Sequence, residues 1–172
     1  MKYARDIITT ILVALIIFVI LQVTIGSFKV YGMCMLPNIH DGDYIMVNKV
    51  SYYFKEPQRG DVIIFHSPRN NNSELIKRII GMPGETIEIK EGEVLVNGEP
   101  LTEPYIMEAP TYEYPIKEIP EGQYFVLGDN RNNSADSHTG WLLSRDEIVG
   151  KAWLNYWPVD DMNVIQHFEF DS

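Results

Sequence analysis

Apolar positions divide the chain into two parts. Residues 7–25 read IITTILVALIIFVILQVTI and carry no charged side chain. At about 1.5 Å per residue, a helix of this length spans roughly 28 Å, close to the hydrocarbon thickness of a bilayer. The run is longer than the apolar core of a typical cleaved signal peptide, and no small-residue cleavage site follows it before the bulky Phe28. We therefore predict a transmembrane anchor over residues 7–25.

Beyond this run the pattern changes to short strands separated by turns. Residues 62–65 are continuously apolar, which is typical of a strand buried on both faces. Residues 86–90 alternate between polar and apolar side chains, and the turn residues 91–93 and 97–98 predict hairpins on either side of a strand at 94–96. The weakly periodic region 91–122 is interpreted as a variable β excursion. Further strands are predicted over 44–50, 75–80, 123–127 and 152–157, with a polar loop at 68–73 and one short helical turn within 141–149.

The predicted fold class is therefore mostly β, with antiparallel sheets and one N-terminal transmembrane helix. Lys2 and Arg5 precede the apolar run. By the positive-inside rule they place residues 1–6 in the cytoplasm. Residues 26–172 then form an extracytoplasmic domain, and the protein is expected to be a single-pass protein of the cell membrane.

Charge and cysteine content exclude several classes of function. The chain has 14 basic and 24 acidic residues, for a net charge of -10. Such a chain has no basic surface to neutralise phosphates, so we expect no nucleic acid partner. The single cysteine excludes an intrachain disulfide and a thiolate zinc site, and the four scattered histidines show no ligand spacing. We expect neither a metal nor another cofactor.

Cys34 is the candidate nucleophile. It lies just past the anchor, between Met33 and Met35. A thiol needs a nearby base or cation to react well, and by position alone a small buried hydrophobe is the simpler interpretation. Gly32, two residues earlier, would let a substrate carbonyl approach the Cys34 amide, a group of the kind that forms oxyanion holes.

Lys77 is the candidate base. In a strand over 75–80 it shares a face with Leu75 and Ile79, while Arg78 takes the opposite face. A lysine on an apolar strand face has two interpretations. It either belongs to an edge strand and reaches water, or it is buried, where desolvation favours the neutral amine that acts as a general base. In the second case Cys34 and Lys77 form a nucleophile–lysine dyad.

A dense polar segment over 128–138 directly follows the predicted buried strand 123–127. Loops at strand ends are common places for functional sites. Here Ser134 is expected to hydrogen-bond to the lysine amine and orient it. Four residues are expected to fix the loop. Asp129, Asn130 and Asp136 are expected to form Asx-type hydrogen bonds, and Arg131 is expected to pair with an acid.

Taken together, these segments resemble the type I signal peptidases, membrane-anchored enzymes that remove signal peptides from exported proteins. After the anchor, GMCMLP at 32–37 resembles the G-x-S-M-x-P box of that family, and RGDVIIF at 59–65 resembles its R-G-D box. The segments KRIIGMPGE at 77–85 and GDNRNNSADS at 128–137 resemble its two remaining boxes. The single anchor and compact length resemble the small Gram-positive type.

The resemblance implies an endopeptidase with a serine/lysine dyad on a scaffold shared with the repressor proteases. Lys77 falls on the family's lysine, Ser134 on the hydroxyl that orients it, and Cys34 on the nucleophile. The implied substrates are signal peptides of exported pre-proteins, cut after Ala-x-Ala-like sites at the outer membrane face. Membrane lipid and the secretion machinery are further implied partners, and no cofactor is implied.

Two residues depart from the family pattern. Cys34 stands where the family has serine, and this fits both a natural thiol variant and a chain whose serine has been replaced. A larger sulfur displaces the attacking atom, so we predict reduced activity. His138 stands where the family usually has arginine. It weakens the inferred pairing with Asp136, although it can still donate a hydrogen bond.

Three alternatives remain open from the residues. The first is a catalytically impaired, membrane-tethered peptide-binding or scaffold protein. A second is a self-cleaving regulator of the repressor type, which would carry a DNA-binding domain in place of the anchor. The third is a cysteine protease whose base is His40, His66 or His138.

Overall fold

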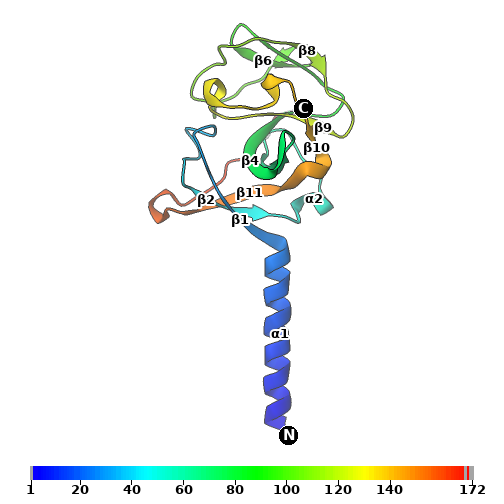
Figure 1. Cartoon of the computed structure of the whole chain (residues 1–172), viewed down its shortest axis with the longest axis vertical. Coiled ribbons are helices and arrows are strands. Elements are labelled where there is room, and N and C mark those ends of the chain that lie inside the picture. Colours follow the sequence, from blue (N-terminus) through cyan, green and yellow to red (C-terminus); the bar gives the residue numbers. More distant parts are fainter. Residues whose placement is uncertain (1, 169, 171–172) are drawn as a thin grey trace.

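A computed structural model describes residues 2–168 and 170, apart from the side chains of residues 2, 4, 71 and 72. The outer limits of the predicted domains, at residues 1 and 172, lie outside this range. A long helix leads into a β-rich domain (Figure 1). Its helices and strands are α1 (Lys2–Thr24), β1 (Ile25–Lys29), β2 (Tyr44–Asn48), α2 (Ser51–Phe54), β3 (Val62–Ser67), β4 (Asn70–Gly81), β5 (Thr86–Lys90), β6 (Glu93–Val96), β7 (Glu99–Pro100), β8 (Tyr114–Glu118), β9 (Gln123–Leu127), β10 (Leu143–Ser144), β11 (Ile148–Trp157) and β12 (Asn163–Val164). Four single-turn 3-10 helices are Arg131–Asn133, Ser137–Thr139, Arg145–Glu147 and Val159–Asp161.

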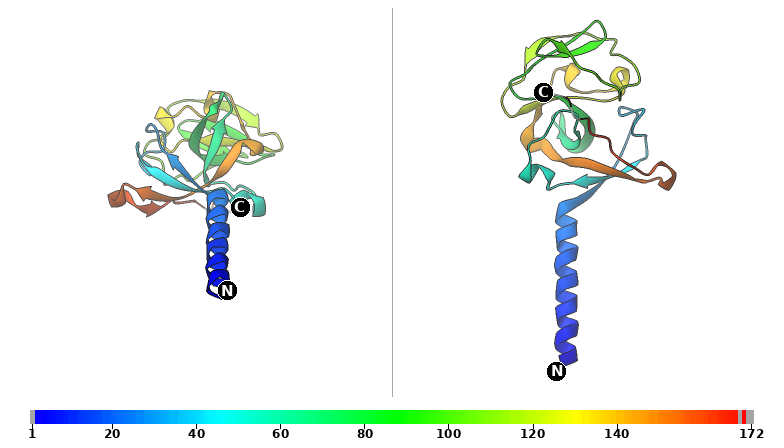
Figure 2. Two further views of the ribbon diagram at one scale, coloured as in Figure 1. Left: turned by 60° about the horizontal axis from the view of Figure 1, so that its bottom comes forward. Right: turned by 180° about the vertical axis from the view of Figure 1, so that it is seen from behind.

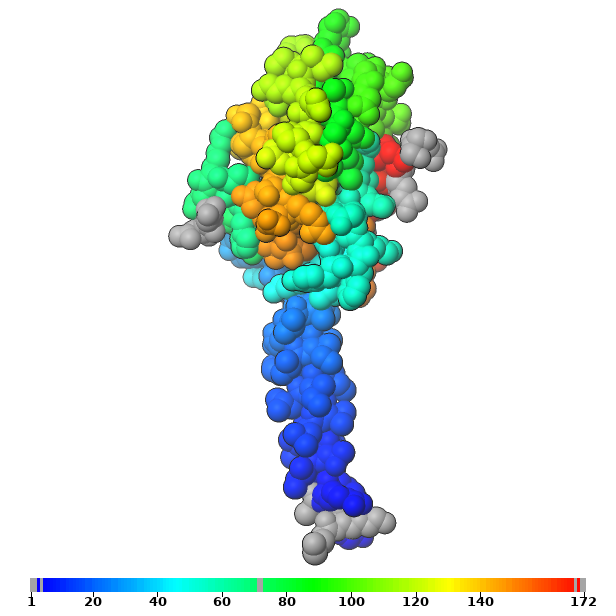
Figure 3. Space-filling view, turned by 90° about the vertical axis from the view of Figure 1, so that its right-hand side faces the viewer, coloured from blue at the N-terminus to red at the C-terminus, as the bar shows by residue number. Residues whose placement is uncertain are grey.

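α1 projects away from the β domain as a rod in every view (Figures 1, 2 and 3). Its stretch from Arg5 to Thr24 is long and apolar enough to cross a membrane, and none of it is buried. This agrees with the predicted apolar helix, although α1 begins at Lys2 and ends one residue before the predicted limit. Ile25 instead pairs with Asn48 at the start of β1, so that the domain follows the helix without a linker.

The larger sheet has the strand order β1-β2-β11-β3-β4-β9-β10, and β12 pairs with β11. Every pairing is antiparallel, which confirms the predicted fold class. β3 and β4 lie in the interior of the sheet. The predicted burial of residues 62–65 on both faces is confirmed, because each of these side chains is fully buried.

The smaller sheet has the order β7-β6-β5-β8 and contains the predicted excursion. Both predicted hairpins are present. Glu91 and Gly92 have φ values of 53° and 83°, and Asn97 and Gly98 have values of 53° and 84°, so two consecutive residues with positive φ form each tight turn. The excursion also contributes buried tyrosines to a core that it shares with β5 and β9. It is therefore an integral part of the domain.

The predicted loop at 68–73 is wrong from residue 70 onward. Ser67 pairs with Asn70, so the β3–β4 hairpin turns over Pro68 and Arg69 and β4 begins earlier than its polar sequence indicated. β11 likewise begins at Ile148, four residues before the predicted strand. The helical turn predicted within 141–149 is confirmed at 145–147. β1 and β12 were not predicted, since neither carries a distinct alternating pattern.

Candidate active site

Cys34 lies on the turn segment between β1 and β2. Met35 and Ile39 fasten this segment to the core, in a buried cluster that includes Ile45 and Ile76. Two amides, of Asn38 and Ile39, donate to the carbonyl of Met35 and shape the turn. Cys34 packs against the edge of this cluster but is only partly buried. The core therefore holds Cys34 in place and leaves the residue partly accessible.

The thiol and the candidate base are in direct contact. Cys34 Sγ lies 2.9 Å from Lys77 Nζ, and this amine also donates to the carbonyl of Ile76 at 2.9 Å. Lys77 is 2% exposed and lies on β4, between β3 and β9. The edge-strand interpretation of Lys77 is therefore wrong, because the lysine is buried in the middle of the sheet and its amine ends at the cysteine.

Gly32 leaves open space next to Cys34. Its φ is +90°, and its amide donates to Asp41 Oδ1 at 2.7 Å. Apart from its two chain neighbours, no described residue has an atom within 4 Å of a Cβ added to Gly32. The amide of Cys34 donates no hydrogen bond to any residue that the structure describes. This N–H is thus unpaired beside an opening where a substrate carbonyl can enter.

The 128–138 loop holds the cysteine segment from the other side. The Asn130 amide donates to the carbonyl of Cys34 at 2.9 Å, and Asn130 Nδ2 donates to the carbonyl of Met33 at 3.0 Å. Asp129, which is fully buried, accepts two bonds from the Arg78 guanidinium, at 2.8 and 2.7 Å. The loop therefore joins the segment that carries Cys34 to β4, the strand that carries Lys77.

Asp136 and His138 secure the start of this loop. Buried Asp136 accepts the Gly128 amide at 2.9 Å, and its other oxygen lies 2.6 Å from His138 Nδ1. A Cβ on Gly128 would lie 2.5 Å from the Cys34 carbonyl oxygen and 2.4 Å from Ser134 Oγ. Only glycine lets the loop approach the cysteine this closely.

Ser134 lies close to the dyad, but the bond expected of it is not formed. Its Oγ is buried and has no hydrogen-bond partner among the described residues, so it does not bond to Lys77. Because Ser134 packs beside Gly128, it still borders the cysteine segment. The expectation that this hydroxyl orients the lysine in the free protein is therefore wrong.

Arg131 pairs with an acid as expected. The guanidinium and Glu103 form a two-pronged, buried ion pair. The sequence does not single out Glu103, because the excursion is rich in acidic residues and no pattern distinguishes one of them from the others. Asn38 was also missed, although it directly follows the first family box. Its amide nitrogen donates to Asp129 Oδ2 and to the carbonyl of Tyr105, both at 2.8 Å.

The histidines do not supply a base for the cysteine. His40 and His66 are exposed, His138 bonds to Asp136, and no histidine among the described residues hydrogen-bonds to Cys34. The cysteine–histidine alternative therefore has no structural support. Within residues 2–168 and 170, no group of three or more His, Cys, Asp or Glu side chains is arranged to hold a metal ion.

A groove of about 500 Å³ lies between β1 and the β3–β4 hairpin. One wall comes from β1 and ends at Tyr31, three residues before Cys34. The other comes from the β3–β4 hairpin and ends at Glu74, three residues before Lys77. Segments adjacent in sequence to Cys34 and Lys77 thus line the groove, although neither of these two residues does.

Comparison with known proteins identifies the family of this chain. The family model described as signal peptidase, peptidase S26, matches residues 3–157. A probable signal peptidase I-1 of Synechocystis sp. is 37% identical over 98% of this chain and 90% of its own length. Signal peptidase I T of Bacillus subtilis is 35% identical over 87% of this chain and 85% of its own length.

A solved structure is also similar. The crystal structure of a signal peptidase I from Enterococcus faecalis is 36% identical and has a TM-score of 0.52. It corresponds to 56% of this chain and 97% of its own chain. The chain therefore belongs to the signal peptidase family, peptidase S26.

Proposed function

We propose that this chain is a membrane-bound signal peptidase I that cleaves signal peptides from exported precursors. Cys34 is the nucleophile and Lys77 the general base. The observation that carries the proposal is the 2.9 Å contact between Cys34 Sγ and a lysine amine buried in the sheet. Family membership and the names of the relatives support the reaction class.

The reaction follows from the positions of these groups. Lys77 Nζ takes the thiol proton, and Sγ attacks the carbonyl carbon of the scissile peptide bond. The Cys34 amide donates to the oxygen that becomes negative, and Lys77 returns the proton to the departing amine. Water then attacks the thioester, with the lysine again as base, and releases the signal peptide.

The substrate would lie extended in the groove between β1 and the β3–β4 hairpin. Its wall residues include an apolar ring at Tyr31 and a carboxylate at Glu74. Small residues at the first and third positions before the cut, the Ala-x-Ala pattern, are what the family resemblance implies. Cleavage of a panel of pre-proteins altered at these two positions measures the preference.

The nucleophile and base are tested by substitution. Cys34→Ser is expected to raise kcat/KM on an Ala-x-Ala pre-protein, because the smaller oxygen places the attacking atom closer to the family's geometry. Lys77→Ala in the serine background should lower kcat by about 10²- to 10⁴-fold through loss of the base. Lys90→Ala, at an exposed position on β5, is the matched lysine control.

One outcome would contradict the expected effect of sulfur, and two would contradict the assignment itself. No gain from serine would show that the sulfur does not limit the reaction. Cleavage that survives Lys77→Ala would remove the lysine from the mechanism. If neither the cysteine nor the serine form cleaves but both retain bound signal peptide, the scaffold alternative is the correct one.

We also propose that α1 crosses the membrane once, with Lys2 and Arg5 on the cytoplasmic side. Single-cysteine reporters test this in the Cys34→Ser background. An impermeant maleimide added to intact cells should label Lys90→Cys in the β domain and spare Tyr3→Cys until the membrane is permeabilised. The reverse pattern would mean the opposite orientation, and labelling of neither in intact cells would place both ends inside.

A further inference from the structure

We propose that the Cys34 acyl-enzyme passes its acyl group to primary amines as well as to water, with a higher amine-to-water ratio than a serine acyl-enzyme at the same site, so that this chain is a transpeptidase as well as a peptidase. The inference rests on the function proposed above, since both begin with attack of Cys34 on a signal peptide. It concerns what happens to the thioester once the mature protein has left.

The leaving group of the second step is sulfur. A thiol has an ordinary pKa of about 8.5, far below that of an alcohol, and a sulfur leaving group departs more readily the lower its pKa. A neutral amine attacks a thioester directly with its own lone pair. Water is a weak nucleophile and must give up a proton to a base during its attack. A thioester therefore favours amines over water more strongly than the ester of a serine enzyme does.

The hydrogen bonds around Lys77 also favour attack by an amine over attack by water. Lys77 Nζ has two acceptors among the described residues, Cys34 Sγ and the carbonyl of Ile76. Ser134 Oγ is buried and unpartnered and gives the amine no third contact. Once Sγ is acylated it becomes a poor acceptor, which leaves Lys77 held through the Ile76 carbonyl alone. The position of the Lys77 amine is then less well fixed. Because hydrolysis depends on this base more than aminolysis does, hydrolysis is slowed more than aminolysis.

An incoming amine has room to reach the thioester. Cys34 is only partly buried, and apart from Tyr31 and Met33 no described residue has an atom within 4 Å of a Cβ position on Gly32. The flanking side chains of Tyr31 and Met33 are 75% and 53% exposed. A small primary amine, such as a glycine amide or the N-terminus of a flexible peptide, can approach along this open side.

The reaction balances without an added reagent. Attack of Sγ breaks the scissile C–N bond, forms the thioester, and sends the thiol proton to the departing amine through Lys77. The acceptor amine then forms a new C–N bond to the same carbonyl carbon and breaks the C–S bond. Its extra proton returns through Lys77 to Sγ. One amide is exchanged for another, and no water is consumed.

The test uses the full-length chain in detergent micelles, with an Ala-x-Ala pre-protein as acyl donor and glycinamide as acceptor. Mass spectrometry separates the released signal peptide that ends in a carboxylic acid from the one extended by glycinamide. Cys34→Ser is the matched comparison, and Cys34→Ala corrects for uncatalysed reaction. The ratio of amide to acid is expected to be at least about tenfold higher for the cysteine chain than for the serine variant, because sulfur is the better leaving group.

Each outcome has a distinct meaning. A higher amide-to-acid ratio for cysteine supports the inference. Equal ratios overturn it and leave the peptidase assignment standing. Cleavage by the serine form alone overturns it and shows that the chain with Cys34 is an impaired peptidase. If neither form cleaves the pre-protein, the proposed function and this inference both fail.

Discussion

Two adjacent cations of β4, Lys77 and Arg78, show how single residues build this site. Alternation along the strand sends them to opposite sides of the sheet. Lys77 ends at Cys34 Sγ, whereas Arg78 binds Asp129 and lies 4.2 Å from the centre of the Tyr105 ring. Lys77 therefore contacts the Cys34 thiol, and its neighbour anchors the loop that holds the Cys34 carbonyl.

The Arg78–Asp129 pair leads to a prediction about stability. Asp129→Asn leaves the buried guanidinium without a counter-charge, which is expected to cost about 3–5 kcal/mol of unfolding free energy. Denaturant unfolding of the full chain in micelles measures the change. Asp160→Asn, at an exposed position, removes the same charge and should stay within about 0.5 kcal/mol of the parent chain. A similar small effect at both positions would mean that the pair does not stabilise the loop.

At the scale of elements, the 128–138 loop is clamped between the larger sheet and the excursion. Glu103 of the excursion binds Arg131, and Asn132 accepts the amide of Thr111 at 2.8 Å and donates to the carbonyl of Ala109 at 3.0 Å. The excursion is thus connected to Cys34 indirectly, because it bonds to the loop and the loop bonds to the Cys34 carbonyl. Its composition gave no sign of this link, because each contact joins residues about 20 or more positions apart.

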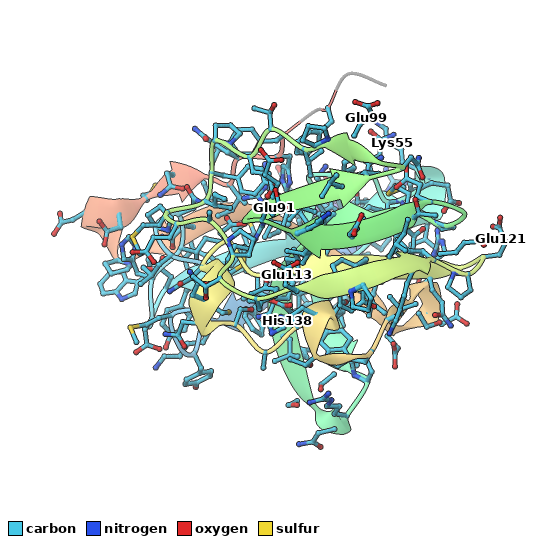
Figure 4. All side chains as sticks on the ribbon, turned by 90° about the horizontal axis from the view of Figure 1, so that it is seen from above. Lys55, Glu91, Glu99, Glu113, Glu121 and His138 are labelled. Carbon is cyan, nitrogen blue, oxygen red and sulfur yellow. The ribbon has the colours of Figure 1, made fainter. Side chains whose placement is uncertain are left out.

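We expect Glu103→Gln to lower kcat/KM on a pre-protein by about ten- to a hundredfold, because small shifts of the loop displace the reacting groups. Glu99→Gln, an exposed carboxylate on β7 in the same excursion, is the matched control and should leave kcat/KM unchanged (Figure 4). Both variants are assayed at a temperature well below unfolding, with circular dichroism to confirm that each is folded. Equal activity in the two variants would separate the excursion from catalysis.

At the scale of the whole molecule, the C-terminal segment closes the domain by returning across β3 and β4. The carbonyl of Gln166 accepts a bond from Arg78 at 3.0 Å, and His167 Nδ1 accepts the Val62 amide at 3.2 Å. Burial, together with the nearby Lys151 and Arg78, lowers the pKa of His167 to about 4 despite the Asp61 carboxylate. The folded protein therefore holds this imidazole neutral.

This pKa has a consequence for stability against pH. In the unfolded chain histidine titrates near 6.5, so between about pH 6.5 and 4 the unfolded state binds more protons than the folded one. Stability from His167 is complete above this range and is lost as the pH falls through it, by up to about 3 kcal/mol. Melting temperatures at several pH values are expected to fall less steeply for His167→Gln than for the parent chain. Parallel curves would show that this histidine is not the titrating group.

The sequence by itself determined the apolar N-terminal helix, the antiparallel strands and the family. These follow from local patterns: apolar runs, alternation, Gly-containing turns, and boxes of adjacent residues such as 32–37 and 77–85. It also identified Cys34 and Lys77 as a candidate pair. It did not determine whether Lys77 is buried or whether the two side chains are in contact. For residues 68–73 the polar sequence predicted a loop throughout. The prediction was wrong from Asn70 onward, because pairing with β3 makes this residue part of β4.

The tertiary structure alone decided which of these groups meet and how. Only the sheet order shows that Lys77 lies on an interior strand, and only packing shows that Ser134 Oγ lacks a partner while Glu103 and Asn38 brace the loop. The physical reason is that contact distance depends on strand register and on the packing of segments far apart in the chain. A hydrogen bond forms or fails over a few tenths of an ångström, and no local sequence pattern encodes a separation that small.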